Sequence, residues 1–178
     1  MYGMVNQAIE QMVRADYGAT VWAAIRRRAG VTQEVFVTTE LYPDEITASL
    51  LVAASDCTGV SGADLRHRLG EFWMFGATAE NGLFAVTGSD VGQFLSHLSR
   101  LRDRMSLLFP ELNLPRLAVE DRTAGAVRIR CSKLEPAMIP FATGLLSGIG
   151  RRFNTPVVVT VDPAGGETGG PARIRVEW

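Results

Sequence analysis

The spacing of apolar residues changes once along this chain of 178 residues, from a helical repeat to an alternating one, and the change falls at Pro110. Ahead of that proline, an apolar stripe recurs at helical spacing between about residues 89 and 109. Its members are Phe94, Leu95, Leu98, Leu101, Met105 and Leu108. Beyond the proline, Val127, Ile129 and Cys131 alternate with polar residues, as in a strand with one buried face. The sequence therefore predicts an α+β chain in which helices come first and strands come last.

The helical part is predicted over residues 1–110 and the α/β part over residues 111–178, and together they have the length of one domain. Periodicity and end signals predict helices over about residues 5–17, 21–29, 43–58, 61–73 and 89–109. Ser61 followed by Asp64 has the pattern of a capping box at a helix start. Gly18 is expected to end the first helix.

The second part is predicted to form an antiparallel sheet with an inserted helix. A turn at residues 122–125 joins two strands into a hairpin, and an apolar helix follows over about residues 136–153. The inner faces of the last two strands are Val157, Val159, Val161, Ile174, Val176 and Trp178. A glycine-rich link at residues 164–171, expected to be mobile, joins these strands, and a short element is expected at residues 83–86.

The charge balance and the apolar runs bear on partners and location. Eighteen Lys and Arg residues against nineteen Asp and Glu residues give a formal net charge of −1, so no global field attracts nucleic acid. No apolar run reaches the roughly 18 residues of a membrane span, and no basic segment followed by an apolar one opens the chain. We expect no nucleic-acid partner, no membrane span and a cytoplasmic location.

Few residues of this chain have the spacing that catalysis or metal binding requires. His67 and His97 lie on different predicted helices, and Cys57 and Cys131 lie far apart, so no zinc or redox motif forms. A Gly-x-Ser-x-Gly hydrolase motif is absent from the sequence. The glycine-rich segment at residues 144–150 lies within a helical pattern, which favours close helix packing over a phosphate loop. We therefore expect neither a catalytic residue nor a metal site.

Short segments, spread in order along nearly the whole chain, form a further pattern. They are Met1–Ile9, Tyr42–Thr47, Leu69–Trp73, Phe109–Leu112, Val119–Asp121, Pro140-Phe141 and Gly144–Leu146. In order and spacing these segments resemble the haem-nitric oxide/oxygen binding family, the H-NOX or HNOB domains. The resemblance implies the H-NOX fold, in which a helical N-terminal half and an α/β C-terminal half enclose a haem. It also implies a sensor of nitric oxide or oxygen that takes part in signalling.

The resemblance implies an axial histidine on the long helix, and here the chain departs from the family. Counted from Phe94-Leu95 and from Phe109-Pro110, the axial position falls at Arg102. A guanidinium stays protonated and has no free lone pair, so Arg102 cannot ligate iron. His97 lies five helical positions earlier, which turns it by about 140° away from the site.

The family's Tyr-x-Ser-x-Arg motif, which holds the haem propionates, is missing as well. Counting back from Pro140-Phe141 places Cys131, Lys133 and Glu135 at the three positions. A shift of one residue gives Arg130, Ser132 and Leu134 instead. Neither alignment keeps the tyrosine and the arginine, and a glutamate at the last position would repel a carboxylate.

The residues that the resemblance places around the cofactor remain apolar or small. They are Val5, Met74, Leu98, Leu101, Pro115, Pro140, Gly144 and Leu145. An empty void of haem size is costly, so the space is expected to be filled by side chains, collapsed, or occupied by another apolar ligand. Arg102 is expected to pair with Asp103, Glu135 or the acid group of such a ligand, or else to extend outward.

The leading expectation is an H-NOX-like module, not an enzyme, that regulates a partner in trans by changing shape. The resemblance implies a histidine kinase or a cyclic-nucleotide enzyme as that partner. The implied gas-sensor function remains open if haem is held by another ligand, or only by apolar contacts together with Lys133, Arg128 and Arg130. A carrier or sensor of another apolar ligand, such as a fatty acid, is a further alternative. An enzyme resembling the related vinyl-reductase folds lacks a candidate acid–base pair in this sequence.

Overall fold

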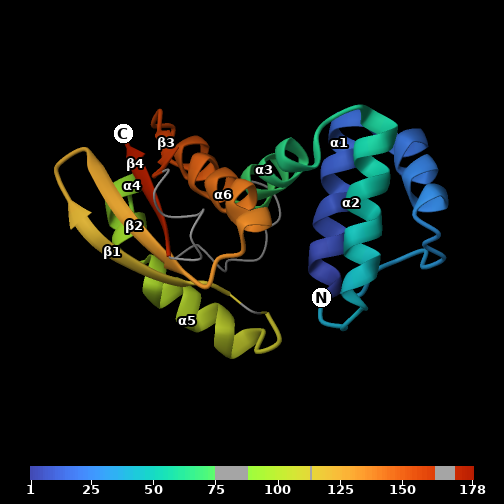
Figure 1. Ribbon diagram of the computed structural model, residues 1–178, viewed down its shortest axis with the longest axis horizontal. Coiled ribbons are helices and arrows are strands. Elements are labelled where there is room, and N and C mark those ends of the chain that lie inside the picture. Colours follow the sequence, from blue (N-terminus) through green and yellow to red (C-terminus); the bar gives the residue numbers. More distant parts are fainter. Residues whose placement is uncertain (75–87, 113, 163–170) are drawn as a thin grey trace.

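The computed structural model describes residues 1–74, 88–112, 114–162 and 171–178. Helices come first along the chain and strands come last (Figure 1), as the change in apolar spacing predicts. The first part holds α1 (Gly3–Arg28), α2 (Asp44–Thr58), α3 (Gly62–Phe72), α4 (Val91–Ser96) and α5 (Leu98–Leu108). The second part holds β1 (Arg116–Arg122), β2 (Ala126–Ser132), the 3-10 helix η2 (Pro136–Met138), α6 (Ile139–Arg152), β3 (Val158–Val161) and β4 (Ala172–Glu177). The element predicted at residues 83–86 and nearly all of the link at 164–171 lie outside the described residues.

The helix ends follow local chemistry that the sequence displays. Gly18 has φ 85° and breaks α1 into two helical segments, as predicted. Gly59 ends α2 in the left-handed conformation, with φ 72°. The Ser61 hydroxyl caps α3 by accepting a hydrogen bond from the backbone N–H of Asp64 at 3.1 Å. These local signals explain why the predicted boundaries of the first three helices agree with the structure.

The single helix predicted over residues 89–109 is wrong in one respect, because the chain interrupts it at His97. This residue has φ −101° and ψ 5° and separates α4 from α5. One residue earlier, the Ser96 hydroxyl donates to the carbonyl oxygen of Gly92 at 2.6 Å and accepts a hydrogen bond from Arg122. A serine bonded to the carbonyl four residues back bends a helix. The rotation argument that turned His97 away from the site therefore does not extend across the break.

The four-stranded sheet has the order β1-β2-β4-β3, and every neighbouring pair is antiparallel. The turn between β1 and β2 falls at the predicted residues. A bulge lies between Val119 and Asp121, where Val119 pairs with Ile129 and Asp121 pairs with Arg128. Along β2 and β4, buried and more exposed residues alternate, so one face of these central strands packs inward and the other faces outward.

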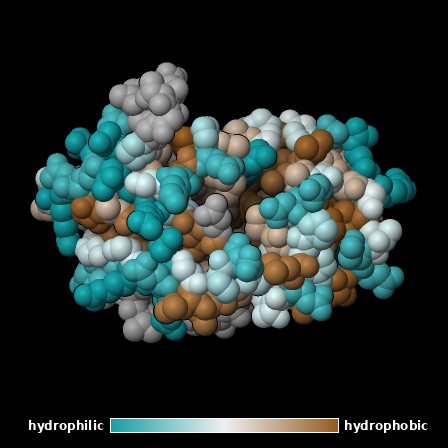
Figure 2. All heavy atoms as spheres, turned by 60° about the horizontal axis from the view of Figure 1, so that its bottom comes forward, coloured by the Kyte–Doolittle hydropathy of each residue, from teal (hydrophilic) through white to brown (hydrophobic). Residues whose placement is uncertain are grey.

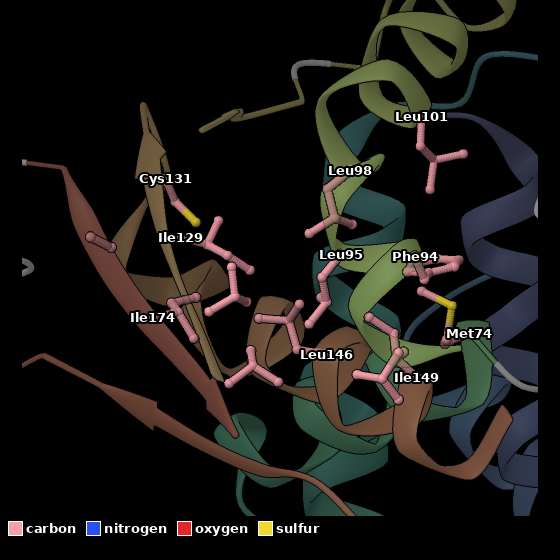
Figure 3. Packing of buried hydrophobic residues seen from close by; sticks show 14 of the residues in the cluster. Met74, Phe94, Leu95, Leu98, Leu101, Ile129, Cys131, Leu146, Ile149 and Ile174 are labelled. Atoms are coloured by element: carbon pink, nitrogen blue, oxygen red, sulfur yellow. The ribbon is translucent and has the colours of Figure 1, made fainter. Parts of the chain in front are cut away.

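Two clusters of buried apolar side chains hold the fold together. The sheet cluster consists of Met74, Val91, Phe94, Leu95, Leu98, Leu101, Met105, Val127, Ile129, Cys131, Leu146, Ile149, Ala172, Ile174 and Val176. The helical cluster consists of Ala8, Ile9, Met12, Val13, Trp22, Ile25, Val31, Phe36, Leu50, Leu51, Ala53, Ala54, Leu65, Leu69 and Trp73. Figure 3 shows Leu95 and Leu98 pointing toward the strands that carry Ile129 and Ile174. Apolar burial on this scale is the dominant stabilising contribution to each half.

Helices α3 and α6 form the most extensive contact between two described elements and join the two halves (Figure 1). A Cβ atom on Gly70 would lie 2.2 Å from the carbonyl oxygen of Phe141, and one on Gly148 would lie 2.8 Å from the Cβ atom of Met74. Backbones can approach this closely only where side chains are absent. The structure thus confirms close helix packing for the glycine-rich segment of α6.

The described helices differ from a membrane span in length and composition. No single one of them is long and apolar enough to cross a membrane. Helices α2 and α3 are long and apolar enough only when their lengths are added, and the two helices are bent by 109° relative to each other.

Candidate ligand site

The structure brings several residues expected around the cofactor into the sheet cluster. Met74, Leu98, Leu101 and Cys131 are all buried there. Figure 3 shows them as parts of one apolar region, which lies between the sheet and the helices. The sequence therefore predicted correctly that these side chains face the interior.

Two further expected residues pack against the helical cluster, and one of them also packs against the sheet cluster. Leu145 of α6 is partly buried and packs against both clusters. Val5 of α1 is partly buried and packs against the helical cluster. Leu145 is thus a half-covered apolar side chain at the edge of both cores, where a ligand between the halves would make contact.

The remaining expected residues lie in different surroundings. Pro115 and Pro140 are half-buried, whereas Lys133 and Glu135 are exposed. Gly144 is buried in the α3–α6 contact, where a Cβ atom would lie 1.9 Å from the carbonyl oxygen of His67. Its position is therefore explained by helix packing without any ligand.

Arg102 makes two contacts through its terminal nitrogens. Its Nη1 lies 3.1 Å from Oδ1 of Asp103, and its Nη2 donates to the carbonyl oxygen of Leu114 at a longer distance of 3.4 Å. Pairing with Asp103, one of the expected partners, is confirmed. Among the described residues, Glu135 forms no ion pair with Arg102. The contact with the carbonyl of Leu114 could not be predicted from the sequence, because every residue has a backbone carbonyl and nothing marks the one twelve residues away.

The Nε atom of Arg102 is buried and has no hydrogen-bond partner among the described residues. Burying a polar donor without an acceptor costs free energy, and the cost is higher for a charged group. Its neighbour Leu101 is buried, and Pro115 next to Leu114 is half-buried. The guanidinium thus has one unused donor on a side that is shielded from water, close to apolar residues.

Cys131 is the other notable group among the expected residues. Burial raises the pKa of its thiol from the ordinary value of 9.0 to about 11. Burial among apolar side chains thus favours the uncharged thiol. Cys131 behaves as an apolar core residue.

The residues at the expected positions do not fit a haem held by histidine. Arg102 has no lone pair to donate, and the exposed Lys133 and Glu135 do not provide the serine and arginine of the family's motif. Within the described residues, no group of three His, Cys, Asp or Glu side chains could hold a metal ion. His97 is half-buried at the junction of α4 and α5.

His67 has a structural contact that the sequence did not indicate. Its Nδ1 lies 3.1 Å from the Thr143 hydroxyl on α6, and its Nε2 lies 3.7 Å from a carboxylate oxygen of Glu71. The histidine thus links α3 to α6 next to the glycine contact. The sequence indicated only the helix on which His67 lies, because its partner Thr143 is 76 residues away in the chain.

The similarity to known families decides what kind of domain this is. The sequence model described as Haem-NO-binding matches residues 2–161, which is most of the chain. The chain belongs to the haem-NO-binding family. It is thus an H-NOX domain, a member of a family of haem-based gas sensors, and the fold and the resemblance inferred from its sequence are confirmed.

Curated relatives of this H-NOX domain include two soluble guanylate cyclases. Soluble guanylate cyclase gcy-31 of Caenorhabditis elegans is 25% identical over 162 residues, which cover 89% of this chain and 23% of that protein. Soluble guanylate cyclase 89Da of Drosophila melanogaster is 21% identical over 181 residues, which cover 98% of this chain and 27% of that protein. The chain therefore spans about a quarter of the length of these relatives.

Solved H-NOX structures have the same fold. The Fe(II) unliganded H-NOX protein from K. algicida superposes with a TM-score of 0.79 at 22% identity, covering 99% of this chain and 96% of that one. The H-NOX protein from S. oneidensis in the Fe(II)NO state gives a TM-score of 0.83 at 19% identity, covering 99% and 98%. At these identities the likeness establishes the fold alone.

Proposed function

We propose that this H-NOX domain is a signalling module that regulates a partner protein by changing shape, without haem held by histidine. The single observation that carries the proposal is Arg102, which stands where the family resemblance expects the ligating imidazole. Its guanidinium is bonded to Asp103 and to the carbonyl oxygen of Leu114. Such a group stays protonated in proteins and cannot donate a lone pair to iron.

The arrangement of the two cores supports a change of shape. The sheet cluster and the helical cluster are separate, and α3 and α6 form the main contact that joins them. Two packed bodies that meet mainly at one pair of helices, with a further ring contact between Tyr2 and Phe109 at 5.3 Å, can rotate relative to each other. A ligand that contacts both bodies near Leu145 would favour one arrangement over the other.

The relatives support a role in signalling. The relatives gcy-31 and 89Da are both named soluble guanylate cyclases, and this chain corresponds to about a quarter of their length. We propose a partner of the same kind, a cyclic-nucleotide enzyme or a histidine kinase, that this domain regulates in trans. Catalysis would then belong to the partner and not to this domain.

A second candidate function is the binding of an apolar carboxylate, such as a fatty acid. It is favoured by the buried Nε of Arg102, a donor without an acceptor among the described residues. A carboxylate would accept from this nitrogen, and the charge-assisted bond would offset the cost of burying it. The apolar tail would contact the half-covered side chains between the clusters, which include Leu145.

A haemin titration followed in the Soret region tests the first proposal. The purified chain is expected to show no saturable Soret band, whereas Arg102→His should gain one, because an imidazole then stands at the axial position. Arg104→His, an exposed change on the same helix, is the matched control and should gain none. A saturable band at one equivalent in the unchanged chain would refute the loss of haem.

Displacement of a fluorescent fatty-acid analogue tests the second candidate. Arg102→Met keeps most of the side-chain volume and removes the charge, so it should weaken binding by about tenfold, the loss expected for one charge-assisted bond. Arg104→Met should leave binding unchanged. Equal affinity in the unchanged chain and Arg102→Met would show that Arg102 does not hold a carboxylate.

A further inference from the structure

Arginines stand in two directly opposed pairs on the outward face of the sheet. Arg128 of β2 is paired with Arg175 of β4, and Arg130 is paired with Arg173. The residues that alternate with them are buried, so all four side chains project from the other face. Arg116 of β1 is exposed on the neighbouring strand.

Three carboxylates balance part of this charge, and one of them, Asp121, is the cross-strand neighbour of Arg128 on β1. Glu120 lies between one pair, with its carboxylate oxygens 3.1 Å from Arg130 and 3.0 Å from Arg173. Glu177 lies 2.7 Å from Arg175. Among the described residues, Arg116 and Arg128 form no ion pair. The five arginines therefore leave a surplus of positive charge, although the whole chain has a net charge of −1.

This arrangement does not favour the stability of the sheet. Like charges directly opposite on neighbouring strands destabilise a sheet. Exposed ion pairs such as those of Glu120 and Glu177 contribute little stabilising free energy. Arg130, Arg173 and Arg175 remain 41–49% exposed in their side chains, so their guanidinium groups are available to a partner. Figure 2 shows hydrophilic side chains gathered over the sheet end of the molecule.

We propose that the arginine face, defined as Arg116, Arg128, Arg130, Arg173 and Arg175, docks an acidic segment of the protein that this domain regulates. The inference rests on the proposed signalling function and adds the chemistry of the partner. A guanidinium binds a carboxylate through two parallel hydrogen bonds, which makes arginine suited to such contacts. Arginine is also enriched in protein interfaces.

A small depression beside the hairpin offers a place for one such carboxylate. It has a volume of about 30 Å³ and is lined by Arg122, Arg128 and Arg175, together with Asp121 and residues of the turn. Three arginines around a space of this size suit a single anionic group. Asp121 limits the surplus of charge there and would disfavour a more highly charged group.

A protein partner fits this face better than a nucleic acid does. Glu120 and Glu177 stand among the arginines and would repel a continuous row of phosphates. The outward positions of the described strands β2 and β4 carry no aromatic ring on which a base could stack. Mixed charges with a basic surplus are instead complementary to an acidic protein surface.

Fluorescence anisotropy of a labelled oligoglutamate peptide at low salt tests the proposal on the purified chain. The peptide should bind, and R128E/R175E should weaken binding by about tenfold, as the loss of two exposed charge contacts requires. R27E/R104E makes the same change of net charge at two exposed helix positions and is the matched control, expected to bind like the unchanged chain. Circular dichroism checks that both variants fold.

Each other result would overturn the proposal. No binding of the peptide would show that the arginine face does not dock an acidic segment. Equal losses of affinity in R128E/R175E and R27E/R104E would show that binding depends only on net charge. Tighter binding of a labelled DNA duplex than of the peptide, with the same dependence on Arg128 and Arg175, would replace the acidic protein by a nucleic acid. Since the assay contains no haemin and no fatty acid, its outcome is independent of the tests of the proposed function.

Discussion

Gly144 on α6 lies so close to His67 on α3 that a Cβ atom on the glycine would stand 1.9 Å from the histidine carbonyl oxygen. This contact is the tightest point of the junction between the two halves. It makes the separation of α3 and α6 depend on a residue without a side chain.

Gly144→Ala is therefore expected to destabilise the protein by about 1–3 kcal/mol, the usual cost of overpacking. The added methyl group forces the backbones of α3 and α6 apart. Chemical denaturation would show a lower midpoint. Gly62→Ala is the control, because a Cβ atom there meets only the flexible end of Arg66 at 3.1 Å. An equal loss in both variants would mean that the contact is not the cause.

Arg128→Thr is expected to stabilise the fold slightly, by about 0.2–0.5 kcal/mol. It removes the charge opposite Arg175 and introduces a residue that favours strands, and the charge it takes from the other neighbour, Asp121, forms no ion pair with Arg128 among the described residues. The midpoint of urea denaturation at low salt measures the effect. Arg130→Thr is the matched control, since Arg130 has a carboxylate partner in Glu120 and its loss should bring no gain. A lower stability of Arg128→Thr would indicate that the attraction between Arg128 and Asp121 outweighs the repulsion between Arg128 and Arg175.

The buried thiol of Cys131 predicts a dependence of stability on alkaline pH. Its pKa is about 11 in the folded protein against 9.0 ordinarily, so the unfolded chain loses the proton first. The stabilisation is fully present below pH 9 and is lost as the pH rises toward 11, by about 2–3 kcal/mol for two pKa units. Unfolding free energies of the unchanged chain and of Cys131→Ala, measured between these limits, should converge. A constant difference would contradict the shift.

The two cysteines should differ in their reaction with a thiol reagent. Cys57 is exposed and Cys131 is buried, and both are free. Ellman's reagent at neutral pH is expected to modify Cys57 rapidly and Cys131 only after denaturation. In Cys57→Ser the native protein should therefore show almost no reactive thiol. Rapid labelling of that variant would mean that the core around Cys131 opens readily.

Local chemistry decided how much of the fold could be predicted from the sequence. The ends at Gly18, Gly59 and Ser61 depend on residues next to them in the chain, and they were predicted. The break at His97 was not, because the neighbouring Ser96 is bonded to Arg122, which is close only in the folded protein. The order of the strands in the sheet could not be predicted from the spacing of apolar residues either.

In the candidate site, too, features set by neighbours in sequence could be predicted, and contacts between distant residues could not. The alternating pattern predicted that Cys131 faces the interior, and the contact of Arg102 with Asp103 joins neighbours in sequence. The contact with Leu114 required the path of the chain after α5. The opposed arginines became visible only once the pairing of β2 with β4 was known, since neither strand alone shows which residue lies across from it.

The contact between α3 and α6 also limits how these helices can evolve. The atoms that obstruct a side chain at Gly70 and Gly144 belong to the peptide backbone of Phe141, Leu145 and His67. Every amino acid carries those atoms, so no second substitution on the facing helix could make room for a side chain at either glycine. A mutation at one of these positions has no compensating partner, and only a displacement of the whole helix could accommodate it.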